Sequence, residues 1–425
     1  MSDLEKKALQ LYIYAFPLIA TEATHFGADD AAGFEHYRAF PDNKVERVVK
    51  LNMDTLYSFA WTQLSNTPYE VHIPRIDDRY YLFPIMDAYT NVVESIGTRT
   101  PDKADGDYIL VYQDDPVPEG YENHRVIRLQ DSLNSILLRI ETRGKKDYNY
   151  INKYQDQFVF KPVYPEKVEK VPKPEMSPVS FLESVTARDF FTLFDRLAVV
   201  NPIKDAEIKK VADELGIGSG NFDYDAASDD VKQALEYAVK DGFVRIDKAA
   251  EDMDVYVISN GWVSKFRDIG SYGTDYLARA STAYHGWGAN IPQDSAYATR
   301  FLGPDGDMLR SDRKYKIRFE KDGFPHAEYF WSLTLYGADS QFLVKNKIDR
   351  FAINTYDVDD GIVETGEDGS LEIFISRDEP TDPREKKNWL PAPADEDAFT
   401  LAIRIYWPDE FTLQGKWDAP IVTEF

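Results

Sequence analysis

One short segment combines an amide and a carboxyl group with apolar and aromatic neighbours: Asn52-Met53-Asp54-Thr55-Leu56-Tyr57-Ser58. If this segment is a β-strand, side chains alternate between its two faces, and Asn52 and Asp54 lie on the same face. A carboxylate in such a run is costly to bury unless it is hydrogen-bonded or paired. Asp54 is therefore either a structural anchor or a group held for chemistry, and the sequence leaves both interpretations open.

Further polar residues could converge with Asp54 in a pocket between two sheets, where they would bind and deprotonate a polar ligand. A carboxylate near an arginine stays ionised and can act as a base, while a tyrosine donates a proton or a hydrogen bond. We therefore predict catalytic roles for Asp54, Tyr57 and Asp87. The predicted substrate-binding residues are Asn52, Tyr89, Asn91, Arg99, Tyr336, Arg404 and Tyr406.

A structural interpretation of the same residues stands beside the functional one. A strand-borne Asp followed by Thr, as at Asp54, commonly ties down a neighbouring loop, and Arg404 beside Tyr406 would bridge strands. Asp87, Tyr89 and Asn91 are spaced two residues apart, which predicts that they share one strand face. Structural ion pairs occupy such positions as well as catalytic groups do.

The sequence argues against metal and nucleophile chemistry. Its six histidines lack His-x-His and His-Glu-x-x-His spacing, and no cysteine is present, so we expect no zinc site. His326-Ala327-Glu328 imitates half of a non-haem iron triad, but no later histidine completes it. The serine-nucleophile motif Gly-x-Ser-x-Gly is absent, and the glycines of residues 216–220 are better explained as a helix end than as a phosphate loop. We therefore expect no metal and no cofactor.

Length and charge bound the class of protein. A chain of 425 residues exceeds what one hydrophobic core usually serves, so two domains or one large insertion are expected. The 74 acidic and 49 basic residues give a formal net charge of -25, which repels phosphate backbones and anionic lipid heads. We predict no nucleic-acid partner and no membrane partner. Aromatic residues make up 14% of the chain, which favours strands, glycan-binding surfaces and a homo-oligomer.

The N-terminus shows no export signal. It lacks a basic start leading into a long apolar run, and it lacks a small-residue cleavage site. No apolar run anywhere in the chain approaches the roughly 20 residues that span a bilayer. The sequence therefore predicts a soluble, cytoplasmic protein.

The order of the predicted elements gives an α+β fold with three parts. Residues 1–145 hold an N-terminal helix, residues 3–26 with Ser2 as N-cap, followed by a β-sandwich. Residues 146–300 form a mainly helical middle region, and residues 301–425 form a second β-sandwich. Both sandwiches are predicted to be antiparallel and jelly-roll-like. The predicted strands are residues 51–64, 69–73, 79–95, 108–112, 126–129, 135–141, 314–320, 329–336, 350–354, 371–376 and 399–406, and the predicted helices of the middle region are residues 181–199, 205–215, 228–252 and 274–284.

Two late strands are each predicted to have one polar and one apolar face, because their side chains alternate with period two. The polar faces carry Ser332, Thr334 and Tyr336 on one strand, and Ala402, Arg404 and Tyr406 on the other. The apolar faces carry Trp331, Leu333 and Leu335, and Leu401, Ile403 and Ile405.

Several spaced phrases resemble a paired bacterial family without a known function. Asn52-x-Asp54-Thr55-x-Tyr57-Ser58, followed by Pro74, Arg79-Tyr80-Tyr81 and Asp87-x-Tyr89-Thr90-Asn91, resembles domain of unknown function 1254. The later phrases resemble domain of unknown function 1214: Trp331-Ser332-x-Thr334-x-Tyr336, Asn346, Asp368-Gly369-Ser370-Leu371, Asn388-Trp389-Leu390-Pro391-Ala392-Pro393 and Arg404-x-Tyr406-Trp407-Pro408. The resemblance implies two jelly-roll-like sandwich parts joined by helices, and it implies no established reaction. Many members look exported, with an N-terminal signal that is not visible here.

Two functions are consistent with the sequence. The first is a small-molecule or saccharide-directed enzyme that uses metal-free acid-base chemistry in a polar interdomain pocket. The second is a non-catalytic ligand-binding or oligomeric assembly protein, a role that an acidic β-sandwich protein serves equally well.

Overall fold

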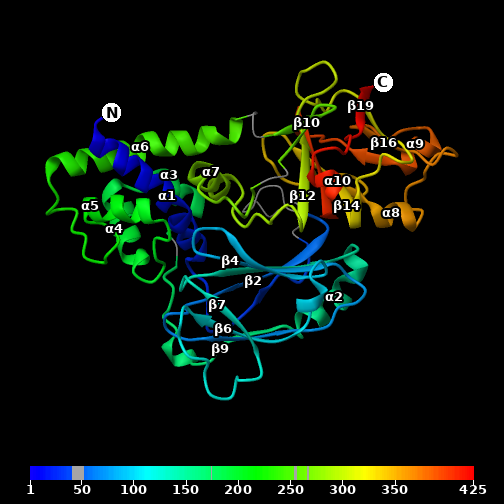
Figure 1. The fold of residues 1–425 in the computed structure, drawn as a ribbon. Helices are drawn as coiled ribbons and strands as arrows, with labels where there is room; N and C mark the ends of the chain where they lie inside the picture. Colours follow the sequence, from blue (N-terminus) through cyan, green and yellow to red (C-terminus); the bar gives the residue numbers. More distant parts are fainter. Residues whose placement is uncertain (41–51, 174, 253–255, 266–267) are drawn as a thin grey trace.

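The computed structural model describes residues 1–40, 52–173, 175–252, 256–265 and 268–425. It is a mixed fold of helices and several largely antiparallel sheets, with an N-terminal helix. Figure 1 shows helices on one side of the molecule, the N-terminal strands in blue and cyan below, and the C-terminal strands in yellow to red on the other side. The predicted combination of helices and antiparallel sheets is thus confirmed, whereas the jelly-roll topology stays a prediction.

Helix α1 (Asp3–His25) is the central element of the helical part. Ser2 caps it as predicted, since its hydroxyl accepts a hydrogen bond from the Glu5 backbone N–H and the Glu5 side chain accepts one from Ser2. Nearly all of its apolar side chains are buried, because helices surround it. These helices are α3 (Pro178–Ser184), α4 (Ala187–Ala198), α5 (Ala206–Leu215), α6 (Asp229–Lys248) and α7 (Tyr276–His285).

Two details explain how the helices pack and end. Gly242 of α6 lies against Tyr12 of α1, where an added Cβ would stand 2.4 Å from the tyrosine ring. Only glycine therefore permits this close crossing. Gly216 ends α5 in the left-handed conformation, with φ 71°, which confirms helix termination for the glycine-rich segment. The predicted helix at residues 181–199 is interrupted at Thr186, which caps α4.

Two sheets of the N-terminal half enclose one hydrophobic core. The first has the order β1 (Glu35–His36), β2 (Thr55–Trp61), β8 (Ser135–Glu141), β4 (Tyr81–Met86) and β5 (Val92–Gly97). The second has the order β7 (Arg125–Leu129), β6 (Gly106–Tyr112), β3 (Tyr69–Ile73) and β9 (Val159–Pro162). Helix α2 (Tyr148–Gln155) lies between β8 and β9 along the chain.

Two sheets of the C-terminal half enclose a second core. The larger has the order β10 (Val257–Ser259), β11 (Trp262–Ser264), β12 (Ser295–Arg300), β18 (Phe399–Pro408), β14 (Ala327–Gly337) and β15 (Ala352–Asn354). The smaller has the order β17 (Trp389–Pro391), β16 (Leu371–Ser376), β13 (Tyr315–Phe319) and β19 (Ile421–Glu424). The short helices α8 (Thr355–Asp359), α9 (Pro383–Lys387) and α10 (Glu410–Leu413) lie in the segments that connect the strands of the C-terminal half.

Some predicted boundaries differ from the structure. The strand predicted at residues 51–64 begins at Thr55, and Leu51 lies outside the described residues. The strand predicted at residues 79–95 is a hairpin, β4 and β5, because residues 87–91 form its turn. The divisions predicted at residues 145 and 300 stay predictions, although β9 pairs with β3 and β12 pairs with β18 across them.

Candidate functional site

The larger C-terminal sheet has one polar face, as the period-two pattern predicts. On β14 and β18, Leu333 and Ile403 belong to the core between the two C-terminal sheets. The alternate side chains point the other way and carry hydroxyl and guanidinium groups. These are Ser332, Thr334 and Tyr336 on β14, and Arg404 and Tyr406 on β18.

A row of polar residues crosses four neighbouring strands of this sheet at one level. The strand register places Asn354 opposite Ser332, Ser332 opposite Arg404, and Arg404 opposite Tyr297. Neighbouring strands lie about 4.8 Å apart, so these side chains form a continuous polar row. The Arg404 guanidinium carbon lies 5.9 Å from the centre of the Tyr297 ring.

Asp54 reaches this row from the N-terminal half of the chain. Its Oδ2 accepts a hydrogen bond from Ser332 Oγ at 2.7 Å and another from the Tyr406 hydroxyl at 2.9 Å. The residue is 2% exposed. Its Oδ1 is buried and has no hydrogen-bond partner among the residues that the structure describes. The carboxylate is thus satisfied on one oxygen and unsatisfied on the other.

Asn52 and Asp54 lie in a turn before β2, so the prediction that they share a strand face is wrong. Asn52 Oδ1 accepts hydrogen bonds from the backbone N–H groups of Asp54 and Thr55, each at 3.0 Å. This side-chain turn is a common alternative to strand pairing for Asn. Asn52 Nδ2 also donates to the Tyr57 hydroxyl at 2.6 Å. The turn still directs the Asp54 carboxylate onto the polar row.

Burial and charge act in opposite directions on Asp54. Burial raises the pKa of its carboxyl group, while Arg404 and the hydrogen bonds from Ser332 and Tyr406 work to lower it. Burial also raises the pKa of Tyr406 well above its usual value, so this hydroxyl stays a donor at neutral pH. Arg404 is itself buried and donates to Thr334 Oγ1 at 3.1 Å and to the Tyr336 hydroxyl at 2.7 Å.

Arg139 of β8 adds a second buried guanidinium, which is not among the predicted site residues. It stands opposite Tyr57 in the strand register, and its guanidinium carbon lies 5.2 Å from the centre of the Tyr57 ring. It donates to the Gly288 carbonyl at 2.8 Å and to Asn290 Oδ1. We define the Asp54 cluster as Asn52, Asp54, Tyr57, Arg139, Tyr297, Ser332, Thr334, Tyr336, Arg404 and Tyr406. Its charged side chains are one carboxyl and two guanidinium groups.

Arg99 lies beside the cluster but is paired elsewhere. Its Nε donates to Asp294 Oδ1 at 2.5 Å, and Ser95 Oγ donates to Asp294 Oδ2 at 2.6 Å. The Tyr80 hydroxyl donates to the Asp294 carbonyl at 2.8 Å, and its ring centre lies 5.6 Å from that of Tyr406. Arg99 therefore fixes the start of β12 next to the cluster, and no contact to Asp54 joins it to the predicted set.

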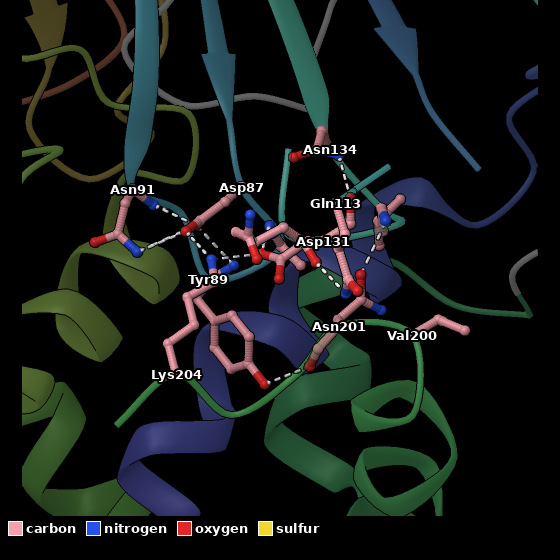
Figure 2. Close-up of polar contacts among 12 residues, drawn as sticks. Asp87, Tyr89, Asn91, Gln113, Asp131, Asn134, Val200, Asn201 and Lys204 are labelled. Atoms are coloured by element: carbon pink, nitrogen blue, oxygen red, sulfur yellow. Dashed lines mark hydrogen bonds and ion pairs between the residues drawn. The ribbon is translucent and has the colours of Figure 1, made fainter. Parts of the chain in front are cut away.

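Asp87, Tyr89 and Asn91 form a separate polar cluster in the turn between β4 and β5, so their predicted strand face is wrong. Asp87 Oδ1 accepts hydrogen bonds from the backbone N–H groups of Tyr89 at 3.0 Å and Asn91 at 2.8 Å, which closes the turn. Figure 2 shows this turn facing the loop before α5. The Tyr89 hydroxyl donates to the Asn201 carbonyl in that loop at 3.0 Å. These contacts dock the helical part onto the N-terminal strands.

Lys204 and Asp131 complete this second cluster (Figure 2). The Lys204 ammonium group donates to Asp87 Oδ2 at 2.7 Å and to Asp131 Oδ2 at 2.8 Å. Burial and the charge of Asp87 raise the pKa of the Asp131 carboxyl to about 7, against the opposing effect of Lys204. We name this set the Lys204 cluster: Asp87, Tyr89, Asn91, Asp131, Asn201 and Lys204.

Comparison with known proteins gives matches to two families and one fold. Residues 32–162 match the family "Protein of unknown function (DUF1254)", and residues 294–410 match "Protein of unknown function (DUF1214)". The chain thus contains a DUF1254 region followed by a DUF1214 region. This confirms the resemblance read from the sequence phrases, in the predicted order. No curated protein matches the chain.

The fold is similar to a solved structure. The crystal structure of the VPA0106 protein from Vibrio parahaemolyticus superposes with a TM-score of 0.74 at 19% identity, covering 99% of this chain and 100% of that chain. This likeness shows the shared fold. A protein from Burkholderia cenocepacia, described as uncharacterized, gives a TM-score of 0.46 at 12% identity, covering 99% of this chain and 93% of that one. None of the described helices has both the length and the apolar character that crossing a bilayer requires.

The Asp54 cluster lies where the DUF1254 and DUF1214 regions meet. Asn52, Asp54, Tyr57 and Arg139 come from the first region, and the other members come from the second. Six of the ten residues predicted from the sequence belong to this cluster: Asn52, Asp54, Tyr57, Tyr336, Arg404 and Tyr406. The described residues form no group of three His, Asp or Glu side chains suited to a metal ion. The chemistry that the cluster's own groups can perform is hydrogen bonding, anion binding and proton transfer.

The raised pKa of Asp131 predicts a pH dependence of folding that the variant Asp131→Asn removes. The folded carboxyl titrates at about 7, above the ordinary value of 3.8 that applies in the unfolded chain. Between these pH values the folded state holds a proton that the unfolded state has released, so stability falls as the pH rises. We expect the stability of the wild type relative to Asp131→Asn to fall from pH 4 to pH 7 in urea titrations. A difference that stays constant over this range would contradict the prediction.

Proposed function

We propose that the Asp54 cluster is a metal-free acid-base site for a small polar molecule, a metabolite or a saccharide, bound between the DUF1254 and DUF1214 regions. The observation that carries this proposal is the unpartnered Oδ1 of the buried Asp54 carboxyl group. Ionised, Asp54 presents an unused acceptor there; protonated on Oδ1, it presents an unused donor. In both states the site lacks one hydrogen-bonding group, which a ligand or a bound water would supply.

The surrounding groups suit a proton-transfer role. A carboxyl group whose pKa is raised by burial is a better base once ionised and lies closer to neutral pH, where acid-base catalysis is most effective. Ser332 and Tyr406 hold Oδ2, which leaves Oδ1 to face the substrate. In this proposal Asp54 is the base, Tyr57 a proton donor, and Asn52, Tyr336, Arg404 and Tyr406 bind the substrate. Asp87, Tyr89, Asn91 and Arg99 take no part in it.

A second role is supported by the same hydrogen bonds. Asp54 belongs to the DUF1254 region, and both of its side-chain donors, Ser332 and Tyr406, belong to the DUF1214 region. Such contacts would fix the two regions against each other in a binding or oligomeric assembly protein that performs no reaction. In that case Asp54 is an anchor whose loss mainly lowers stability.

The variant Asp54→Asn separates the two roles. For an acid-base site we expect the melting temperature to change by less than about 3 °C, since removing the buried charge offsets the weakened hydrogen bonds. The wild type should gain thermal stability with at least one member of a metabolite and oligosaccharide panel, and the variant should lose that response. Both are measured by differential scanning fluorimetry. Asp54→Ala is the control for side-chain volume and should melt lower than Asp54→Asn.

The opposite pattern identifies an anchor. A large drop in the melting temperature of Asp54→Asn, together with no ligand response in the wild type, would sink the acid-base proposal. Light scattering of both proteins then tests assembly, because an anchor needed for a homo-oligomer should change the measured mass.

A further inference from the structure

A partly enclosed cavity of about 350 Å³ lies beside the polar row, between α7 and the β11–β12 end of the larger C-terminal sheet. This volume falls within the range of small-molecule sites, about 300–1,000 Å³. Much of its wall consists of small or apolar side chains, among them Ala278, Ala289 and Leu277. Such walls favour the apolar body of a ligand.

The strand register connects the cavity to the Asp54 cluster. Val263 of β11 stands opposite Thr299 of β12, so Lys265, two residues beyond Val263, comes to the level of Tyr297. Tyr297 stands opposite Arg404 on the other side and belongs to both the cavity wall and the cluster. The cavity therefore continues the polar row beyond Tyr297.

Several polar groups in the cavity wall lack protein partners. Ser281 of α7 is 6% exposed, and its hydroxyl has no hydrogen-bond partner among the described residues. The same holds, within the described chain, for the hydroxyls of Tyr297 and Thr299. Lys265 likewise has no ion pair to any described residue, although the protein has a large excess of acidic side chains. Polar groups that line a cavity and have no protein partner are available to a ligand.

The other ionisable groups in the wall are already engaged. Asp275 caps α7, where its Oδ1 accepts a hydrogen bond from the Ala278 backbone N–H at 3.0 Å. His285 Nε2 lies 3.3 Å from Asp247 Oδ1. Asp252 also lines the cavity and already has a partner. The unused polar groups are thus one ammonium and three hydroxyls, a set that complements an anion.

We propose that this cavity binds a small carboxylic acid, with its carboxylate paired to Lys265 and hydrogen-bonded by Ser281 and Tyr297, and its apolar body against Ala278 and Ala289. The inference deepens the proposed function, on which it rests for the reaction at Asp54, by naming the class of molecule that would meet the cluster. The protein's net negative charge does not prevent this binding, because physiological salt screens charges more than about 8 Å away while Lys265 acts at contact distance.

The test uses two fluorescent probes with the full chain. The probe 8-anilinonaphthalene-1-sulfonate combines an aromatic body with an anionic group, and N-phenyl-1-naphthylamine has a similar body without the charge. We expect saturable binding of the anionic probe at one site per chain, displaced by benzoate or hexanoate. Lys265→Met should lower the affinity for the anionic probe about tenfold or more, as expected for loss of one charged contact. It should change the affinity for the neutral probe little.

Two further variants locate the site. Ser281→Ala should lower the affinity for the anionic probe about threefold or more, because one hydrogen bond to the anion is lost. Ala278→Phe places a phenyl ring in the cavity and should abolish binding of both probes. Lys145→Met, at an exposed lysine that pairs with Asp349 and does not line the cavity, is the control and should bind like the wild type. Should Ala278→Phe fail to fold, Lys265→Met and Ser281→Ala decide the question.

The outcomes separate this inference from the proposed function. The cavity is not a carboxylic-acid site if the anionic probe binds equally to the wild type, Lys265→Met and Ser281→Ala. The same conclusion follows if neither benzoate nor hexanoate displaces the probe. If Asp54→Asn binds the probe and responds to benzoate or hexanoate in the same way as the wild type, the cavity stands and the acid-base role of Asp54 fails.

Discussion

Replacing Arg404 by methionine is expected to lower the free energy of unfolding by about 3–5 kcal/mol at pH 8, the range typical of removing one partner from a buried charged network. Arg404 is 5% exposed, and its charge opposes the burial penalty on the Asp54 carboxyl group. The variant also removes the hydrogen bonds to Thr334 and Tyr336. The measurement is a urea titration of the wild type and the variant at pH 8 and pH 5.

The pH dependence shows how much of this loss comes from charge. Without Arg404 the pKa of Asp54 should rise further, so protonation of Asp54 at pH 5 should recover part of the stability. The double variant Asp54→Asn/Arg404→Met should be more stable than the sum of the two single changes predicts, because the two side chains are coupled.

Arg188→Met is the matched control, since Arg188 pairs with Asp225 on the exposed surface, and it should change stability far less. Two results together would refute the electrostatic coupling: the same loss of stability for Arg404→Met at pH 5 and pH 8, and strict additivity with Asp54→Asn. Lost packing would then account for the whole effect.

The strand pattern was the part of the site that the sequence predicted best. Alternating residues on β14 and β18 predict one apolar and one polar face for each strand, and the structure confirms this pattern. The apolar face belongs to the core, and the polar face carries Ser332 and Tyr406, which contact Asp54. Period two is a consequence of backbone geometry alone, so it can be read without knowing what the strand packs against. The polar face is covered by Asp54, which lies 278 residues before Ser332 and 352 before Tyr406, and no local pattern specifies such a contact.

At Asp54 and at Asp87 the sequence pattern predicts a strand, whereas the structure has a turn. Asn52 with Asp54, and Asp87 with Tyr89 and Asn91, have the spacing of one strand face, but Asn52 and Asp87 use their side-chain oxygens to close turns. An Asx turn and a strand face both place polar residues two apart, so spacing does not distinguish them. The extended segment before Asp87 therefore ends earlier than its apolar pattern suggested.

Four members of the Asp54 cluster are not among the predicted site residues. Ser332 and Thr334 lie on the predicted polar strand face, whereas Arg139 and Tyr297 have no such prediction. Arg139 of β8 stands between Leu138 and Ile140 in an otherwise apolar run, and a cation in such a run is a usable signal of a buried functional or structural charge. Tyr297 lies on β12, a strand inside the region predicted to be mainly helical, because helical segments precede it. Its position opposite Arg404 depends on the pairing of β12 with β18, which is a long-range contact.

Replacing Lys204 by methionine is the second prediction with a large expected effect, and it tests the Lys204 cluster. Lys204 is the cation between Asp87 and Asp131, whose side chains are 4% and 0% exposed. Without it two buried carboxylates face each other, which strongly favours protonation of one of them. We expect a loss of about 2–3 kcal/mol at pH 8, below the range for a fully buried pair because the Lys204 side chain is 37% exposed.

The loss should be smaller at pH 5, because the pKa of Asp131 is already about 7 with Lys204 present and should rise further without it. A protonated Asp131 could then donate a hydrogen bond to Asp87 and replace part of the lost contact. Asp131→Asn in the Lys204→Met background should recover most of the stability at pH 8, since it removes one of the two charges. Two results together would contradict the prediction: an equal loss at pH 5 and pH 8, and no recovery in the double variant. They would show that Lys204 does not act through the charges of Asp87 and Asp131.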